Sequence, residues 1–323
     1  MQEIWYARTG MTQVLRPLSW LFCCVVFVRK WLYRLHIFKS VRLPVPVIVV
    51  GNLTVGGTGK TPLVVALLNQ LKREGYRPGV VSRGYGGQAQ SWPQQVRPDS
   101  DPVMVGDEPI LISRRTGCPM AVGADRVAAA RALLKYANVD LIVSDDGLQH
   151  YALQRDIEIA VVDGVRRFGN GFCLPAGPLR EPVARLERAD FVVTNGSALE
   201  NEFAMQYNGS ILVSLADPSE QRKLSSFTGQ AVHAIAGIGN PQTFFTSLKQ
   251  AGIEIEEHEF PDHYDYTESD LTFEGEKAII MTEKDAVKCQ RFSLAGMWYL
   301  PIEAKLDHEF EMQLLKRIEA SHG

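Results

Sequence analysis

The sequence predicts an α/β protein: a P-loop α/β/α domain with a parallel sheet, a second, smaller α/β domain, and an N-terminal helix at a membrane interface. Three observations support this. Short apolar runs rich in β-branched residues alternate with segments that have helical apolar spacing. A glycine-rich segment follows the first run, and the N-terminal region is both apolar and basic. We therefore expect boundaries at 1–42, 43–216 and 217–323.

The expected strands and helices follow one another in a regular order. The run VPVIVVGN is typical of a buried strand, and TPLVVALLNQLKREGY has the apolar spacing of a helix that ends at Gly75. Strands are expected next within 77–83, 139–146, 157–163 and 189–195, and a helix within 123–137. A strand within 209–216 leads away from this unit. After the polar stretch 217–228, further strands and a helix are expected within 231–252 and 277–285.

Charge is distributed unevenly along the chain. The 323 residues are 46% hydrophobic and carry a net charge of -3, which argues against a general polyanion binder and therefore against nucleic acid as a partner. Within 1–42, however, seven basic residues stand against the single acid Glu3, so this segment is +6 and the remainder is -9. The imbalance favours an anionic membrane surface as partner. The basic residues are Arg8, Arg16, Arg29, Lys30, Arg34, Lys39 and Arg42.

The N-terminal segment predicts a helix in the membrane interface. Its uncharged run between Arg16 and Arg29 has twelve residues, which as a helix cover roughly 18 Å against a hydrocarbon core of about 30 Å. Such a run is too short to span unless charges are buried. Trp20 and Trp31 are residues that favour the interface. A signal peptide fits less well because no small-residue cleavage site follows, and a buried helix of a soluble core is the other alternative.

The segment GNLTVGGTGKTP indicates a phosphate-binding loop. Thr54 stands where the usual pattern has its first glycine, and Pro62 stands just after the Lys-Thr pair. Neither residue rules out a phosphate-binding loop. Thr54 is tolerated if its position does not need a positive φ, and Pro is tolerated in the first turn of a helix. Lys60 is expected to reach the β and γ phosphates of ATP, and Thr61 to bind Mg²⁺. The expected nucleotide-binding residues are Thr54, Val55, Gly56, Gly57, Thr58, Gly59, Lys60 and Thr61.

Three pairs of polar residues are candidates for the chemistry. Asp145 and Asp146 end a buried strand, where adjacent acids are costly without a cation, although an Asx-type turn is an alternative. Which of the two binds metal stays open. Asp107 and Glu108 precede a proline and are also typical of a helix N-cap. The pair Asp262–His263 is weaker, because a lone His is more often structural.

The order of motifs GNLTVGGTGKTP, SRGYGG, GDEP, GADR, DDGLQH, PAGPLREP, FPDHY and TEKD resembles the tetraacyldisaccharide 4'-kinase family of lipid A biosynthesis from about residue 12 onward. The resemblance implies transfer of the ATP γ-phosphate to the 4'-hydroxyl of a tetraacylated glucosamine disaccharide 1-phosphate. It also implies a peripheral enzyme at the cytoplasmic face of the bacterial inner membrane. Thr54 and Pro62 belong to the family's pattern. We expect a monomer.

The same resemblance implies roles for individual residues. Lys60, Asp146, Asp107 and His263 are the catalytic candidates, with Asp107 as the base for the sugar hydroxyl and His263 orienting it. Thr61, Glu108 and Asp145 are the metal candidates. The residues implied to line the substrate site are Arg126, His150, Arg180 and Glu181.

Two other functions share part of the pattern. A membrane-associated P-loop ATPase switch of the cell-division or partition type would have the loop, the acids and the amphipathic segment, but it has no need of a second unit that carries Asp262 and His263. In a GTPase, TEKD would be the motif that recognises the guanine base. The usual motif has Asn before Lys, where this chain has Glu283.

Overall fold

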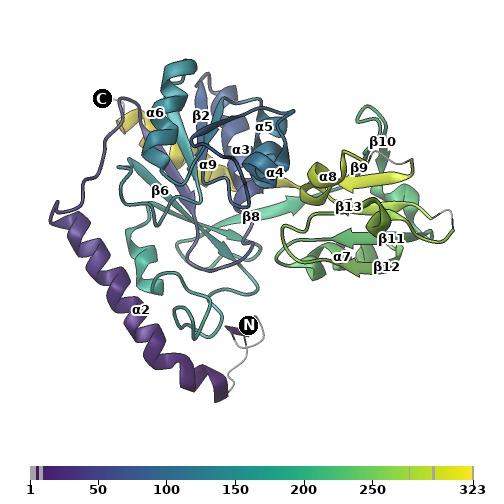
Figure 1. Ribbon diagram of the computed structural model, residues 1–323, viewed down its shortest axis with the longest axis horizontal. Helices are drawn as coiled ribbons and strands as arrows, with labels where there is room; N and C mark the ends of the chain where they lie inside the picture. Colours follow the sequence, from purple (N-terminus) through teal and green to yellow (C-terminus); the bar gives the residue numbers. More distant parts are fainter. Residues whose placement is uncertain (1–4, 7–9, 276, 293–294, 322–323) are drawn as a thin grey trace.

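The computed structural model describes residues 5–6, 10–275, 277–292 and 295–321, which form a large and a small lobe (Figure 1). Of the basic segment expected at 1–42, Arg8 and the acid Glu3 lie outside the described residues. The helices are α2 Gly10–Arg34, α3 Lys60–Arg73, α4 Pro102–Val105, α5 Asp107–Thr116, α6 Arg126–Tyr136, α7 Pro241–Gln250, α8 Glu283–Cys289 and α9 His308–Ser321. Short 3-10 helices are η1 Val183–Arg188, η2 Leu224–Phe227 and η3 Glu268–Leu271.

The large lobe is built on a mostly parallel sheet. Its order is β15-β8-β7-β6-β1-β5-β2-β4-β3, and only the two edge strands pair antiparallel. The bounds are β15 Glu303–Leu306, β8 Phe203–Asn208, β7 Phe191–Asn195, β6 Ile157–Asp163, β1 Val47–Gly51, β5 Leu141–Asp145, β2 Pro78–Ser82, β4 Met120–Val122 and β3 Gln94–Val96. The glycine-rich loop leaves the central strand β1, whose neighbours are β5 and β6. The α/β class with a parallel sheet is confirmed.

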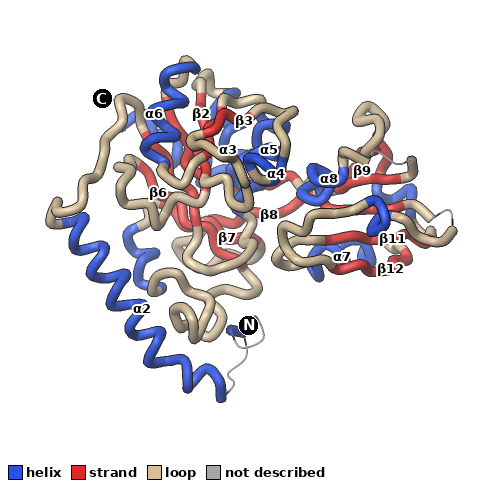
Figure 2. The backbone as a smooth tube through the Cα atoms, viewed as in Figure 1, coloured by secondary structure: helices blue, strands red, loops and turns tan. Residues whose placement is uncertain are grey.

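Helices cover both faces of this sheet (Figure 2). Alternate residues of β1 point to opposite faces. Ile48 and Val50 join one core together with α3, α5 and α9. Val47 and Val49 join a second core together with α6. Burial on both faces is why β1 is an uninterrupted apolar run rather than an alternating one.

The small lobe has a sheet of its own, with the order β10-β9-β14-β13-β11-β12. The three pairings among β14, β13, β11 and β12 are parallel, and β9 pairs antiparallel on both sides. The bounds are β10 Gln221–Lys223, β9 Ile211–Ser214, β14 Met297–Leu300, β13 Ile279–Thr282, β11 Ala231–Ala236 and β12 Glu254–Glu259. α7 packs beside β11 and β12.

The expected boundaries of the smaller unit, 217–323, do not match the sheets. β9 already belongs to the small sheet, whereas β15 and α9 return to the large lobe. The return has a packing reason. Phe310, Leu314 and Ile318 recur at helical spacing and are buried in the large core, where the Phe310 ring meets Phe191 edge-on with centroids 5.3 Å apart. The C-terminal helix therefore completes the first lobe.

Helix α2 lies along the outside of the large lobe (Figure 1). By length and composition the 25-residue helix could cross a membrane, although its uncharged run between Arg16 and Arg29 has only twelve residues. Only 11% of its apolar stretch is buried. This exposure disagrees with the core-helix alternative. Its basic side chains do not form an outward stripe: Lys30 pairs with the buried Glu181, and Arg16 lies 5.1 Å from the Phe172 ring. The polar side chains Lys30 and Arg16 of α2 therefore contact the large lobe, whereas many of its apolar side chains are exposed.

Candidate active site

The glycine-rich loop has the geometry of a strand–loop–helix anion site. Gly56 and Gly59 adopt φ of 101° and 92°, which a side chain would strain. Helix α3 then starts at Lys60, so Thr61 and Pro62 occupy its first turn, where Pro62 needs no N–H. The backbone N–H groups at a helix start favour a phosphate. The departures at Thr54 and Pro62 are therefore compatible with the loop.

Several loop positions are already bonded to the rest of the chain. The Val55 N–H donates to the carbonyl of Pro178 at 2.8 Å, so this amide is not free for phosphate, contrary to its predicted role. Arg166 donates to the carbonyl of Gly57. A Cβ on Gly239, in the small lobe, would lie 3.1 Å from the Gly57 nitrogen. The small lobe thus packs directly against the loop.

Lys60 belongs to a cluster around Asp146. Its Nζ lies 3.1 Å from Asn52 Oδ1 and 3.5 Å from Asp146 Oδ1. Arg180 donates to both Asp146 oxygens at 3.0 and 3.1 Å, and Arg126 donates to the Asp146 carbonyl at 3.2 Å. Burial alone would raise the pKa of Asp146, but the charges of Lys60 and Arg180 outweigh it and lower the pKa to about 2. The Asp146 carboxylate is ionised and already neutralised.

Asp145, unlike Asp146, has no cationic side chain bonded to its carboxyl among the described residues, and its pKa is raised rather than lowered. Its carboxyl is 1% exposed and accepts a hydrogen bond from Ser82 Oγ at 3.1 Å, whereas its Oδ1 has no partner within the described part of the chain. Burial, followed by the charges of Glu108 and Asp146, raises the pKa of Asp145 to about 7. An unpaired carboxylate in this position favours a cation.

Asp107 and His263 meet between the lobes. Asp107 opens helix α5, and His263 lies in the turn after β12. The His263 Nδ1–H donates to the carboxylate, with both oxygens 3.1 Å away. Burial would raise the pKa of Asp107, but the His263 hydrogen bond and the Lys284 charge lower it to about 2, and the same hydrogen bond raises the pKa of His263. His263 has a φ of 60°, a strained backbone of the kind concentrated at functional sites.

Lys284 is a site residue that the sequence analysis missed. Its Nζ lies 3.0 Å from Asp262, 3.1 Å from Glu108 and 4.0 Å from Asp107. Burial lowers the pKa of Lys284, but Glu108 and Asp107 outweigh this and raise it. The signal is the TEKD motif, which is part of the family resemblance but carries no predicted role for its lysine.

The remaining TEKD residues have structural roles. Asp285 is fully buried and accepts hydrogen bonds from Thr282 Oγ1, Tyr266 OH and the Gly237 N–H at 2.6, 3.0 and 2.9 Å. Its oxygens are therefore occupied, so the geometry does not support the GTPase interpretation.

The other predicted residues divide between two places. Arg126 and Arg180 join the Asp146 cluster, as described above. His150 lies near Arg126, and burial together with that charge lowers the pKa of His150 to about 4. Glu181 faces elsewhere: it pairs with Lys30 of α2 and accepts from Tyr151 OH at 2.7 Å. The structure does not bring Glu181 to the Asp146 cluster. Asn52, Ser82 and Arg166 also contact the site. Asn52 and Ser82 lie within the motifs GNLTVGGTGKTP and SRGYGG but had no predicted role, and Arg166 lies in none of the motifs.

Comparisons with known proteins decide the family. The family model described as tetraacyldisaccharide-1-P 4'-kinase (LpxK) matches residues 11–319. The chain belongs to the tetraacyldisaccharide 4'-kinase family. It is 52% identical over 315 residues to the tetraacyldisaccharide 4'-kinase of Nitrosococcus oceani, covering 98% of this chain and 93% of that one. It is 51% identical over 320 residues to that of Methylobacillus flagellatus, covering 98% and 95%.

A solved structure shares the fold. It is the "apo" form of LpxK from Aquifex aeolicus in complex with ATP, with a TM-score of 0.79, 30% identity, and coverage of 95% of this chain and 99% of that one. Family membership makes this chain an ATP-dependent 4'-kinase of lipid A biosynthesis. It excludes the alternative of an ATPase switch as the principal activity.

Proposed function

We propose that the chain transfers the γ-phosphate of ATP to the 4'-hydroxyl of a tetraacylated glucosamine disaccharide 1-phosphate, with the reaction centre between Lys60 and Asp107. The proposal rests on one observation above all: the loop-side cluster of Lys60 and Asp146 and the Asp107–His263 pair lie at the same junction of the lobes, linked through Asp145. Gly57 of the loop lies against Gly239 of the small lobe, and Asp107 contacts His263 across the same junction. Burial, followed by the charges of Glu108 and Asp146, raises the pKa of Asp145, which lies between the two clusters.

The glycine-rich loop binds the ATP phosphates. The Aquifex aeolicus relative, solved in complex with ATP, supports this assignment. The candidate donors are the amides of Gly56, Gly57, Thr58 and Gly59. Lys60 contacts Asn52 and Asp146 in this structure. When ATP is bound, its ammonium group supplies the positive charge at the γ-phosphate. Thr58 Oγ1 is buried and lacks a hydrogen-bond partner among the residues described, which leaves it available to a ligand.

Thr61, Glu108 and Asp145 are the residues that would hold Mg²⁺. Hydroxyl and carboxylate oxygens are the ligands that Mg²⁺ prefers, and the orphaned Oδ1 of Asp145 fits a cation. Asp146 is the weaker candidate of the two adjacent acids, because Lys60 and Arg180 already neutralise it. When bound, Mg²⁺ neutralises charge on the phosphate oxygens.

Asp107 acts as the base. Its lowered pKa keeps it ionised at neutral pH. As the sugar oxygen bonds to the γ-phosphorus and the bond to the ADP oxygen breaks, the hydroxyl proton passes to Asp107. A weak base is sufficient, because the proton moves late in a loose transition state. His263 holds the carboxylate through its 3.1 Å hydrogen bonds, and Lys284 fixes the position of the neighbouring Glu108.

Arg126, Arg180 and His150 are proposed to line the substrate side of the cluster, where the two guanidinium groups favour an anionic ligand. Glu181, in contrast, is assigned to holding α2 through Lys30. This assignment replaces the substrate role implied by the family resemblance.

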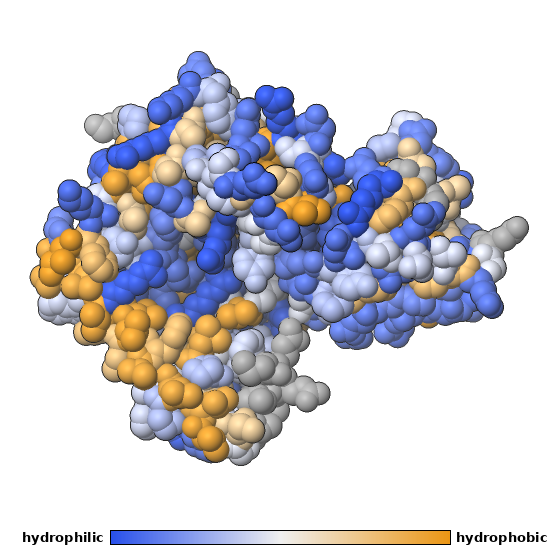
Figure 3. Space-filling view, in the orientation of Figure 1, coloured by the Kyte–Doolittle hydropathy of each residue, from blue (hydrophilic) through white to orange (hydrophobic). Residues whose placement is uncertain are grey.

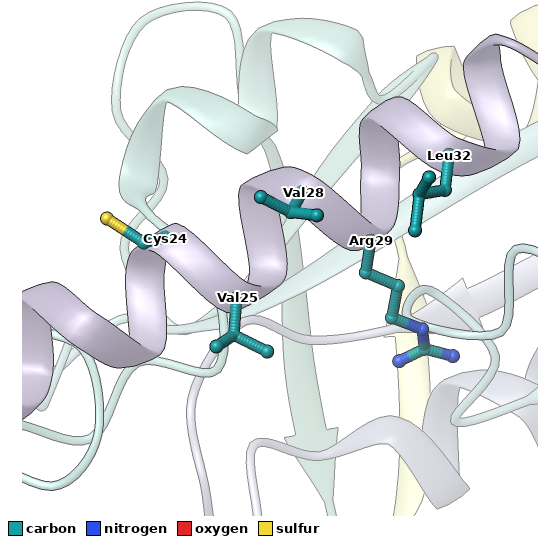
Figure 4. Close-up of a pocket in the computed structure, with 5 residues that line it drawn as sticks. All are labelled: Cys24, Val25, Val28, Arg29 and Leu32. Atoms are coloured by element: carbon teal, nitrogen blue, oxygen red, sulfur yellow. The ribbon is translucent and has the colours of Figure 1, made fainter.

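Helix α2 is proposed to lie in the cytoplasmic face of the bacterial inner membrane, where the acylated substrate resides, with the protein peripheral and monomeric. Apolar side chains gather over α2 in the space-filling view (Figure 3). A shallow hollow of ≈ 320 Å³ on this helix is lined by Cys24, Val25, Val28, Arg29 and Leu32 (Figure 4). An apolar face of this kind inserts at the headgroup boundary. Exposed large apolar residues of the helix are Met11, Val14, Leu18, Trp20, Leu21, Val25, Phe27, Val28 and Trp31.

The transfer step is tested with purified protein, labelled ATP, Mg²⁺ and a membrane lipid extract. Label should enter a glycolipid. It should be found as a phosphate ester on the 4'-hydroxyl, on the glucosamine that does not carry the 1-phosphate. Release of labelled inorganic phosphate with no labelled lipid would contradict the proposal and restore the ATPase interpretation.

The membrane role is tested with the double substitution Val25→Glu and Val28→Glu. Binding to anionic phospholipid vesicles should fall, while activity on detergent-dispersed substrate should be preserved, because neither residue contacts the reaction centre. The matched control is Met312→Glu, on the exposed face of α9. Equal vesicle binding by all three proteins would contradict the interfacial assignment.

A further inference from the structure

Three potential metal ligands lie together on the small lobe, apart from the reaction centre. His233 belongs to β11, and Glu256 and His258 belong to β12, the edge strand of that sheet. The parallel register pairs His233 with Glu256. Glu256 and His258 are two residues apart and so project from the same face. Adjacent strands therefore present two imidazoles and one carboxylate side by side.

Two of the distances between these groups are close to those of a metal coordination shell. His233 Nδ1 lies 3.1 Å from His258 Nε2 and 3.2 Å from Glu256 Oε2. The three ligand atoms all lie within 4.8 Å of one another. Tetrahedral zinc, with bonds of about 2.0–2.2 Å, separates its ligand atoms by about 3.3 Å. Only small side-chain movements would be needed to place one cation in bonding distance of all three.

The surroundings orient these side chains. Lys277 holds the other carboxylate oxygen of Glu256, so that Oε2 faces the imidazoles. Phe273 covers both rings, with centroids 4.2 Å from His233 and 4.3 Å from His258. His233 is only 4% exposed, whereas the Glu256 side chain is 52% exposed, which leaves a route of entry.

The charge of the region also suits a cation. β12 also carries three more carboxylates, Glu254, Glu257 and Glu259. Negative charge along the edge strand raises the local concentration of divalent cations.

We propose that His233, Glu256 and His258 bind one zinc-type divalent cation, with a fourth position left to water. The donor set, two imidazoles and a carboxylate, is one that zinc uses. Such a cation would clamp the edge strand β12 to β11. Because β12 leads directly into Asp262 and His263, it would also fix the strand from which that turn departs. Stabilisation, rather than a step in phosphoryl transfer, is its expected effect.

The experiment uses the full chain in detergent, stripped with a chelator and then dialysed against Zn²⁺ in the absence of ATP and Mg²⁺. One Zn²⁺ per chain should be retained, and Tm should rise. Co²⁺ should give the intense visible bands of a four-coordinate site. His258→Ala and Glu256→Gln should each weaken binding by about tenfold or more and abolish the Tm shift. His308→Ala, at an exposed position on α9, is the matched control and should behave as wild type.

One control measurement and one further variant make the result decisive. The circular dichroism spectrum of Glu256→Gln without Zn²⁺ should match that of wild type and so reports that the variant chain is folded. His263→Ala alters the other site that combines a histidine with carboxylates, the proposed reaction centre. This variant should retain the Zn²⁺, because His263 is not one of the three proposed ligands. If wild type binds no Zn²⁺, or if His263→Ala loses the ion while His258→Ala keeps it, the proposal is overturned. The contact between His233 and His258 would then be an ordinary hydrogen bond.

Discussion

The two halves of the proposed reaction centre are made in different ways. Lys60 and Asp146 follow β1 and β5, neighbouring strands of one sheet, so the parallel register alone brings their ends together. Asp107 and His263 are 156 residues apart in the sequence and belong to different lobes. The first half depends on a local loop and one strand pairing, whereas the second depends on how the lobes dock. A local motif can therefore identify the first half by itself, whereas the pairing in the second half was expected only from the resemblance to a known family.

The halves also differ in charge balance. Each contains a carboxylate whose pKa is lowered to about 2, Asp146 next to Lys60 and Asp107 next to His263 and Lys284. Asp145 stands between them with a pKa raised to about 7. Of these three carboxylates, Asp146 and Asp107 are neutralised by neighbouring cations and Asp145 is not, so a bound cation contributes most at Asp145.

The largest effect is expected from Lys60→Ala, which removes the mobile cation from the loop half. The rate of transfer should fall by about 10³–10⁵-fold, the range seen when a cation at the phosphoryl transition state is lost. Steady-state kinetics with labelled ATP provide the measurement, and Lys305→Ala, at an exposed position on β15, is the control. Turnover close to wild type would remove the loop half from the mechanism.

The half assembled across the lobes is tested with Asp107→Asn and His263→Ala. Asp107→Asn should lower kcat by about 10²–10⁴-fold because the proton acceptor is lost. His263→Ala should also lower kcat. If the two act as a unit, the double variant should lose much less than the product of the single effects. Multiplicative losses, measured at saturating ATP, would mean that the two residues act separately and would return His263 to a structural role.

The electrostatic link across the lobes is tested with Lys284→Gln. Lys284 lowers the pKa of Asp107, so its removal should raise that pKa toward the ordinary aspartate range. The acid limb of the pH profile of kcat should then move to higher pH, with a greater loss at about pH 5 than at about pH 8. Lys305→Ala again serves as control. An unchanged profile at saturating Mg²⁺ would show that Lys284 does not act on Asp107.

The smallest effect is expected on stability, from Asp145→Asn. A carboxyl with a raised pKa keeps its proton in the folded state after the unfolded chain has lost it. The free energy of unfolding therefore falls as pH rises from about 4 to 7. Without Mg²⁺, the variant should exceed wild type in Tm by a few degrees at about pH 8 and by less at about pH 5. Asp99→Asn, at an exposed position, is the control.

Addition of Mg²⁺ gives a second comparison of the Tm of wild type and Asp145→Asn. It should raise the Tm of wild type at about pH 8 and leave Asp145→Asn nearly unchanged. Equal shifts in both proteins would assign the metal to other carboxylates, with Asp146 as the next candidate.

Much of the fold was predictable because it depends on local patterns. The strands containing Val47–Gly51, Leu141–Asp145 and Ile157–Asp163 were expected from apolar runs, and all three form. The three-residue strands Gln94–Val96 and Met120–Val122 were missed, since so few residues carry no detectable alternation. The C-terminal return of Glu303–Leu306 was also missed, because pairing with a strand about a hundred residues earlier leaves no local pattern.

By itself, the sequence determined the phosphate-binding loop, the acidic pair after β5 and the apolar N-terminal helix, because each depends on neighbouring residues and their backbone preferences. Only the tertiary structure decided that Asp107 meets His263, that Lys284 stands among Asp262, Glu108 and Asp107, and that Glu181 faces α2. These contacts join segments whose distance is set by the packing of two sheets and several helices. Packing of that kind depends on the whole core, and no short stretch of sequence contains it.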